Sequence, residues 1–315
     1  MLSKNNGGNP DIAYSRRGIS VPLREELYID KSKSGDFGIC AAQRMSAEAE
    51  RLFGGINDDV LEANVAQKTS VEMRSEYLER LRASIIGSDS LFTTPYGEPK
   101  PIVYADWTAS ARGIRQIEDY IQEEVIPFYG NTHTTTSVTG HQSTCYRHEA
   151  RQIIAESVNA KVTGRAATDV VLFTGNGTTS SIDKLIQGMG LNLPVPQGYD
   201  KDKYSPVVFT SVYEHHSNLL PWRETNAEVV TIAYSPETGV DLVDLVAKLE
   251  MYKDRAVKIG AFCTASNVTG VMTAVDEVSI ILHEHLALAF FDYATAAPYV
   301  KIDMNPVVAR LLWVL

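Results

Sequence analysis

The pattern of apolar and polar positions changes near residue 100. From residue 101 onward, short apolar runs that end in turn or capping residues alternate with stretches of helical spacing. The apolar runs predict strands at residues 102–107, 169–174, 207–210, 228–233, 259–264 and 286–292. Residues 241–252 show the helical spacing, with Asp241 as N-cap and apolar side chains at Leu242, Leu245, Val246 and Leu249. This alternation predicts an α/β fold with a mostly parallel sheet and helices on both faces.

The first part of the chain has a different pattern. Residues 1–95 lack a strong β-type apolar run and predict a helical extension that precedes a sheet domain at residues 96–315. Two stretches, residues 41–53 and 65–86, have the spacing of amphipathic helices. In the second stretch, one face carries Met73, Tyr77, Leu78, Leu81 and Ile85. We expect this face to pack on the domain that follows; a coiled-coil partner role is the alternative.

Composition narrows the class of protein. The 315 residues are 44% hydrophobic and 22% charged, and no stretch approaches the roughly 18 apolar residues of a membrane span, so we expect no membrane insertion. The formal net charge of -10, without a basic cluster, argues against a nucleic-acid partner. Three scattered cysteines and the lack of an apolar signal segment favour a cytoplasmic location. A mitochondrial address stays open because of Arg16 and Arg17.

A glycine-rich turn follows the predicted strand at residues 169–174. Its sequence is GNGTTSS at residues 175–181, and a helical stretch comes next. Glycines let the backbone approach an anion closely, and helix-start amides with Thr and Ser hydroxyls donate to phosphate oxygens. The motif lacks the Gly-Lys-Ser/Thr of a P-loop, and its GxG is not a full dinucleotide fingerprint. Taken alone, it also fits an ordinary capped turn or a nucleotide-binding loop.

Three further segments place polar side chains directly after predicted strands, where ligands bind in sheets of this type. The sequence EHHSNLLPW at residues 214–222 contains His215, whose flat ring can stack on an aromatic ligand; a turn histidine bonded to the backbone is the alternative. We expect no metal site there, because adjacent histidines point in different directions on most backbones. Asn267 can donate to a phenolic or carbonyl oxygen. Asp292 ends an apolar run, and a carboxylate there needs a cationic or hydrogen-bonding partner such as a pyridinium N–H.

Together, these four motifs in this order resemble the class V aminotransferase superfamily, and within it the cysteine desulfurase branch. The segment YADWTA at residues 104–109 is similar to that family's Tyr-Leu-Asp-Asn-Ala-Ala, and the resemblance covers about residues 101–306. It implies the large domain of a fold type I pyridoxal-phosphate transferase that acts on an amino acid, by desulfuration, lyase or transamination chemistry. Members of this family are usually homodimers, so the resemblance implies a possible homodimer for this chain too.

The resemblance also implies roles for individual residues. Gly177 and Thr178 would hold the phosphate of pyridoxal 5'-phosphate, with the dipole of the following helix contributing. His215 would stack on the pyridine ring, and Asn267 would bond the phenolic oxygen of that ring. Asp292 would pair with the protonated ring nitrogen and so keep the ring an electron sink.

Two departures from the family pattern affect these expectations. Thr295 stands where many members have Gln, and its shorter side chain bonds the phenolic oxygen differently or does not reach it. The Schiff-base lysine of the family is expected about two dozen residues after Asp292, but 23 residues follow, and Lys301 is too near and lacks a preceding His. We therefore interpret the domain as truncated, with little or no turnover. The alternative is a non-catalytic remnant that keeps the fold and binds partners.

Overall fold

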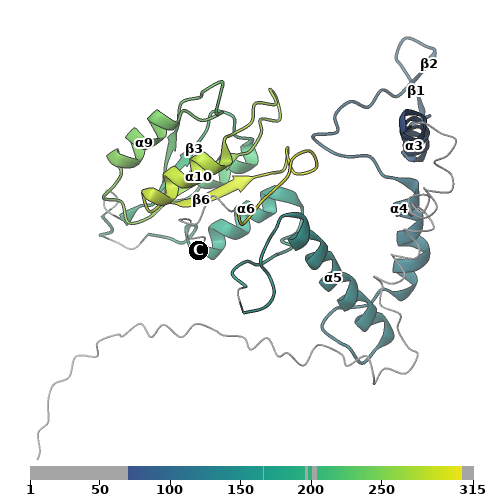
Figure 1. Cartoon of the computed structure of the whole chain (residues 1–315), viewed down its shortest axis with the longest axis horizontal. Helices are drawn as coiled ribbons and strands as arrows, with labels where there is room; N and C mark the ends of the chain where they lie inside the picture. Colours follow the sequence, from purple (N-terminus) through teal and green to yellow (C-terminus); the bar gives the residue numbers. More distant parts are fainter. Residues whose placement is uncertain (1–69, 166, 196–197, 201–203, 307–315) are drawn as a thin grey trace, which may run out of the picture.

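The computed structural model describes residues 70–306, apart from residues 166, 196–197 and 201–203. The expected helix at residues 41–53 lies outside the described residues. The chain from residue 177 onward folds around a four-stranded parallel sheet with strand order β4-β3-β5-β6 (Figure 1). The strands are β3 (Val207–Thr210), β4 (Glu228–Thr231), β5 (Lys258–Cys263) and β6 (Leu288–Asp292). Four of the six predicted strands are thus confirmed.

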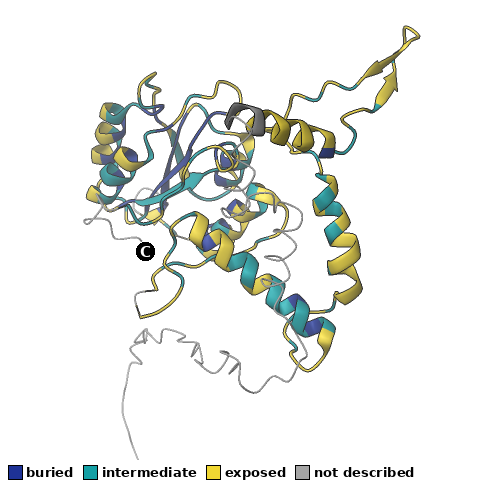
Figure 2. Cartoon of the chain, turned by 45° about the vertical axis from the view of Figure 1, so that its right-hand side comes forward, coloured by how far each residue is buried: buried dark blue, intermediate teal, exposed yellow. Residues whose placement is uncertain are grey.

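Helices cover both faces of this sheet, as the sequence predicts. They are α6 (Gly177–Gly188), the short α8 (Leu220–Arg223), α9 (Leu242–Met251) and α10 (Val275–Glu284), with a 3-10 turn η4 (His216–Asn218) before α8. Because neighbouring strand residues face opposite sides, Phe209 packs with the residues of α9 and α10, whereas Val208 packs with those of α6 and Trp222. Buried residues concentrate in β3 and β5 and on the inner faces of these helices (Figure 2).

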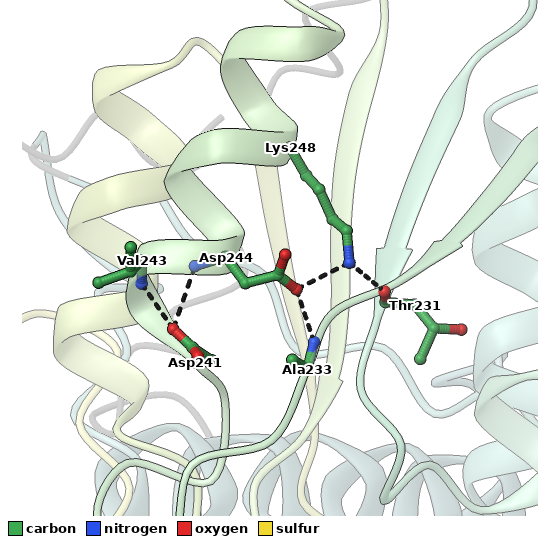
Figure 3. Close-up of polar contacts among 6 residues, drawn as sticks. All are labelled: Thr231, Ala233, Asp241, Val243, Asp244 and Lys248. Atoms are coloured by element: carbon green, nitrogen blue, oxygen red, sulfur yellow. Dashed lines mark hydrogen bonds and ion pairs between the residues drawn. The ribbon is translucent and has the colours of Figure 1, made fainter.

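The predicted helix at residues 241–252 forms as α9 and is fastened to β4 at its first turns (Figure 3). Asp241 accepts hydrogen bonds from the N–H groups of Val243 and Asp244 and so caps the helix. Asp244 accepts from the Ala233 N–H and from Lys248 Nζ, each at 2.7 Å, and Lys248 also donates to the Thr231 carbonyl. These bonds fix the helix on the end of the strand.

Two predicted strands do not form. The segment at residues 102–107 is irregular, with Val103 88% exposed, and the pairing in this region is instead a short antiparallel hairpin of β1 (Leu91–Thr93) and β2 (Pro99–Pro101). Residues 169–174 precede α6 without a strand assignment and leave Val170 and Leu172 exposed. An apolar run becomes a strand only where a neighbour accepts its backbone hydrogen bonds, and neither segment has such a neighbour among the described residues.

The helices before the sheet lie apart from it (Figures 1 and 2). They are α3 (Ser70–Ser84), α4 (Arg115–Tyr120) with its continuation η2 (Ile121–Val125) and η3 (Ile126–Phe128), and the long α5 (Val138–Ser157). The apolar face expected to pack on the sheet domain is largely exposed at Tyr77, Leu78 and Leu81, so that expectation is wrong for these side chains. The proposed domain boundary at residue 95 stays a prediction.

A hydrogen-bonded clasp joins the loop after α5 to the segment after β6. Asn305 Nδ2 donates to Asp169 Oδ2 at 2.7 Å and to the Asn159 carbonyl at 2.9 Å. Asn159 Nδ2 in turn donates to Asp303 Oδ1 at 2.6 Å. The two sides of the clasp are 136 to 146 residues apart in the sequence, so these bonds hold the start and the end of the sheet region together.

Candidate functional site

A cavity of about 240 Å³ lies where β6 ends and α6 begins. Helix α6 contributes polar and apolar side chains, η4 and α8 contribute an amide and an indole, and β6 with the residue after it contributes aromatic rings and a carboxylate. The lining residues are Thr178, Ser181, Ile182, Leu185, Asn218, Trp222, Phe290, Phe291, Asp292 and Tyr293. Ligands bind at the carboxyl ends of parallel strands in such sheets, so the cavity is in the expected place.

The start of α6 offers backbone and hydroxyl donors to this cavity. Gly175 and Gly177 have φ angles of +105° and +71°, a left-handed conformation that favours glycine. Asn176 precedes the helix without a side-chain cap, so its side chain does not occupy the first amides of α6. A methyl group in place of the Gly177 hydrogen would meet no atom within 4 Å, which leaves room above the turn. The helix start can therefore hold an anion beside Thr178.

Asp292 supplies the carboxylate of the cavity wall. Its Oδ1 accepts a hydrogen bond from the Ala294 N–H at 2.8 Å, and its backbone carbonyl accepts from the N–H and the hydroxyl of Thr264. Within the described part of residues 70–306, Oδ2 accepts no hydrogen bond. The carboxylate is thus held in place and keeps one oxygen for a cationic or N–H partner.

His215 lies in the neighbouring turn with an exposed side chain and is not among the residues that line the cavity. Its Nδ1 accepts from the Ser217 N–H at 3.2 Å and lies 3.1 Å from Ser217 Oγ. Ser217 Oγ is also 2.7 Å from Thr179 Oγ1 on α6. The histidine turn and the glycine-threonine turn, 38 residues apart in the sequence, are therefore hydrogen-bonded to each other.

The other two predicted ligand residues are also not among the residues that line the cavity. Asn267 is exposed in the turn after β5, and Thr295 is partly buried in the turn after β6. Of the six predicted residues, Thr178 and Asp292 line the same cavity, and Gly177 adjoins Thr178. The roles of all six stay predictions.

The sequence reasoning missed a polar network behind the cavity. Glu214 Oε1 accepts from the hydroxyl and N–H of Ser211 and from the Cys263 N–H, and Oε2 accepts from Asn218 Nδ2 at 2.6 Å. Asn218 Oδ1 accepts from the fully buried Trp222 indole at 3.1 Å. These residues stand in the EHHSNLLPW motif, so the spacing of polar residues ahead of a Pro-Trp pair was the available signal.

Burial controls the ionisation of two groups in this network. Burial raises the pKa of Glu214, although its hydrogen bonds act in the opposite direction. Burial and the nearby Glu214 carboxylate raise the pKa of the Cys263 thiol to about 12, so this thiol is not a nucleophile at neutral pH. Among the described residues, no group of three or more His, Cys, Asp and Glu side chains is arranged to hold a metal ion.

A parallel sheet covered by helices, with a cavity at its strand ends between a glycine-threonine helix start and a strand-end aspartate, defines a domain of the α/β class. The chain belongs to the aminotransferase class-V family, whose model matches residues 103–309. In the part of the chain that the structure describes, none of the helices is both long and apolar enough to cross a membrane.

Curated relatives agree with this assignment, and a solved structure agrees with the fold. A probable cysteine desulfurase of Halalkalibacterium halodurans is 29% identical over 65% of this chain and 47% of its own length. A probable cysteine desulfurase of Pyrococcus abyssi is 26% identical over 67% of this chain and 48% of its own length. The apo structure of cysteine desulfurase from Thermococcus onnurineus NA1 superposes with a TM-score of 0.54 and 23% identity, covering 71% of this chain and 49% of that chain. The chain spans about half the length of the curated relatives it matches.

Proposed function

We propose that this chain carries the pyridoxal-phosphate site of an enzyme that acts on an amino acid, of the class V aminotransferase and cysteine desulfurase type. One observation carries the proposal: the Thr178 side chain at the start of α6 and the Asp292 carboxylate at the end of β6 line the same cavity. Membership of the class-V family supports it. The names of the curated relatives favour cysteine as the substrate and desulfuration as the reaction.

The residues present fit this cofactor. Its phosphate requires N–H and O–H donors, which the helix start at Gly177 and Thr178 provides in an open position. Its ring nitrogen requires an acidic partner, and Asp292 keeps Oδ2 for that purpose. The ring is apolar on its faces, which suits the Phe290 side chain on the α6 side of the sheet.

Each residue has a distinct task in this proposal. Asp292 holds a proton on the ring nitrogen, Gly177 and Thr178 bind the phosphate, and His215 covers the ring. Asn267 and Thr295 act on the phenolic oxygen. When bound, pyridoxal phosphate supplies an electron sink for the bond-breaking step at the amino acid. No lysine is among the described residues that line the cavity, so we propose that these walls hold the cofactor without a covalent bond.

The location and assembly of the protein belong to the same proposal. We propose a cytoplasmic enzyme that works as a homodimer, does not use nucleic acid and takes a free amino acid as its substrate. Soluble expression and a stable oligomer without affinity for the cofactor would favour the alternative of a non-catalytic protein that keeps the fold and binds partners.

Calorimetric titration of the chain with pyridoxal phosphate and with pyridoxamine phosphate tests the proposal. Pyridoxamine phosphate lacks the aldehyde, so equal affinity for both compounds indicates binding without a lysine adduct. We expect Thr178→Val and Asp292→Asn to weaken both affinities by roughly five- to fiftyfold, because each removes a hydrogen bond to a charged group. Glu277→Gln, a substitution at an exposed position of α10 outside the cavity lining, is the control.

Two results would contradict the proposal. One is the absence of binding by either compound to the folded chain. The other is a borohydride-reducible adduct on Lys301, which would show that a lysine outside the cavity lining holds the cofactor. A titration with ATP tests the alternative of a nucleotide-binding protein. That alternative requires a measurable affinity for ATP.

A further inference from the structure

We propose that Ser217 and Thr179 are positioning residues that orient His215 and couple it to the anion-binding end of α6. The inference rests on the proposed function in one respect: it takes the ring of His215 as a contact of the cofactor. Its central observation is independent of any ligand, since it is the hydrogen-bonded row His215 Nδ1, Ser217 Oγ and Thr179 Oγ1.

Two contacts of Nδ1, one with the Ser217 N–H and one with the Ser217 hydroxyl, favour the His215 tautomer that carries its proton on Nε2. The ring nitrogen Nδ1 accepts from the Ser217 N–H at 3.2 Å, and a backbone N–H can only donate. Nδ1 therefore presents its lone pair, and the proton of the neutral ring is on Nε2. The side chain is exposed, and Nε2 makes no hydrogen bond to the described residues, so this N–H is available to a ligand.

The two hydroxyls extend this order to α6. Ser217 Oγ lies 3.1 Å from Nδ1 and 2.7 Å from Thr179 Oγ1. Since Nδ1 is an acceptor, its contact with Ser217 Oγ requires the Ser217 O–H to donate, so the N–H and O–H of Ser217 share the one lone pair of Nδ1, and Thr179 O–H donates to Ser217 Oγ. Each hydroxyl then donates its single proton to one acceptor. The row thus fixes both the tautomer and the rotation of the imidazole.

Thr179 connects this row to the phosphate end of the site. It is the third residue of α6, directly after Thr178, which lines the cavity. An anion that orders the first turn of α6 consequently orders Thr179, and through Ser217 it orders His215. Ser217 and Thr179 do not line the cavity, so they act on a ligand only through their neighbours.

The tautomer is measured on the chain without cofactor, by long-range nitrogen–proton spectra of protein labelled with 15N-histidine. The His215→Gln variant identifies the signal of this ring. We expect His215 to show a protonated Nε2, and we expect Ser217→Ala and Thr179→Val to shift its two nitrogen signals toward the average of both tautomers. Ser180→Ala is the matched control, because its hydroxyl is on the same turn of α6 and outside the row.

The coupling is measured by titration with pyridoxamine phosphate. Ser217→Ala and Thr179→Val should each weaken binding about three- to tenfold, the effect of one net hydrogen bond, and the double variant should lose no more than either single variant. The conservative variants Ser217→Thr and Thr179→Ser keep a hydroxyl and should restore both the spectrum and the affinity.

The outcomes separate this inference from the proposed function. A proton on Nδ1 in the parent chain, or nitrogen signals unchanged by both hydroxyl deletions, overturns the positioning role. Additive losses of affinity overturn the coupling. If the parent chain binds no cofactor while the spectra behave as expected, the proposed function fails and the positioning of His215 stands.

Discussion

Glu214 Oε1 accepts the backbone N–H of Cys263 at 3.0 Å and thereby joins the turn after β3 to the end of β5. The two residues are 49 positions apart in the sequence, and the same carboxylate also holds Ser211 and Asn218. One acidic side chain therefore links Asn218, a residue of the cavity wall, to the ends of β3 and β5. Its ionisation should affect the stability of the fold.

The first prediction concerns Glu214→Gln and pH. Burial raises the pKa of Glu214 above the ordinary value of 4.5 that it has in the unfolded chain. The contribution of the protonated carboxyl is complete below pH 4.5 and is lost as the pH rises through the folded-state pKa. Urea unfolding across this range should show the parent losing stability relative to Glu214→Gln as the pH rises.

A matched control has the opposite sign. The Ser235 hydroxyl donates to the exposed Glu237 carboxylate at 2.8 Å and lowers the pKa of this group. The parent should therefore gain stability relative to Glu237→Gln as the pH rises. Identical pH slopes for the two variants would contradict the role assigned to burial at Glu214.

The second prediction concerns the indole of Trp222. The Trp222→Phe substitution removes the donor to Asn218 Oδ1 and leaves a buried amide oxygen without that partner. We expect the free energy of unfolding to fall by about 1–3 kcal/mol, measured by urea denaturation. Trp107→Phe is the control, because Trp107 is 38% exposed and should change stability little. Equal losses of unfolding free energy in the two variants would show that the buried hydrogen bond of Trp222 does not contribute to stability.

The third prediction compares two glycines of α6. Both have open space at the Cβ position, but Gly177 has a φ of +71°, whereas Gly188 is not among the residues of positive φ. Gly177→Ala should destabilise the fold by about 1 kcal/mol through backbone strain, and Gly188→Ala should stabilise it by about 0.5 kcal/mol. Thermal unfolding measures both. A loss of stability for Gly188→Ala would show that the helix end needs a glycine for another reason.

The fourth prediction concerns Asp244 at the start of α9. Burial would raise its pKa, but the Ala233 N–H and the Lys248 side chain outweigh burial and hold the pKa below its ordinary 3.8. Its stabilising effect is present above pH 3.8 and is lost as the pH falls through the folded-state pKa. Asp244→Asn should cost about 1–2 kcal/mol at neutral pH and almost nothing in strong acid.

The exposed ion pair on α3 is the control for this variant. Arg82 and Glu79 are each 68% exposed, so Glu79→Gln should cost well under about 1 kcal/mol at any pH. Chemical denaturation at neutral pH and in acid measures the free energy of unfolding of both variants. A cost for Asp244→Asn that persists in acid would contradict the assigned cause.

The sheet was predictable from the sequence because its strands are apolar runs, of which β3 and β5 are fully buried and β4 and β6 less so. β3 begins and ends where the apolar run at residues 207–210 predicts, and β4, β5 and β6 differ from their predictions by at most two residues at each end. The failures at residues 102–107 and 169–174 have one cause: apolar character indicates burial, but a strand also needs a partner backbone. The local pattern of apolar residues does not say which segment supplies that partner backbone.

The candidate site was predictable in part for a related reason. Residues after parallel strands meet at one edge, and this rule brings Thr178 and Asp292 to one cavity. The network of Glu214, Asn218 and Trp222 was not predicted, because its bonds depend on side-chain rotamers and on Cys263, a distant residue. The resemblance gave a role to His215 but not to the side chains that hold it.

The clasp between Asn159 and Asn305 makes the sheet region a ring without a covalent closure. The entropy cost of closing a loop grows only with the logarithm of its length. Closing this long loop therefore costs little more than closing a shorter one. A short peptide linker between the two sides could therefore replace the hydrogen bonds, and new termini could be opened between the exposed residues Pro236 and Glu237. The order in which the strands are synthesised would change in such a circular permutant, while the cavity between α6 and β6 would keep every wall.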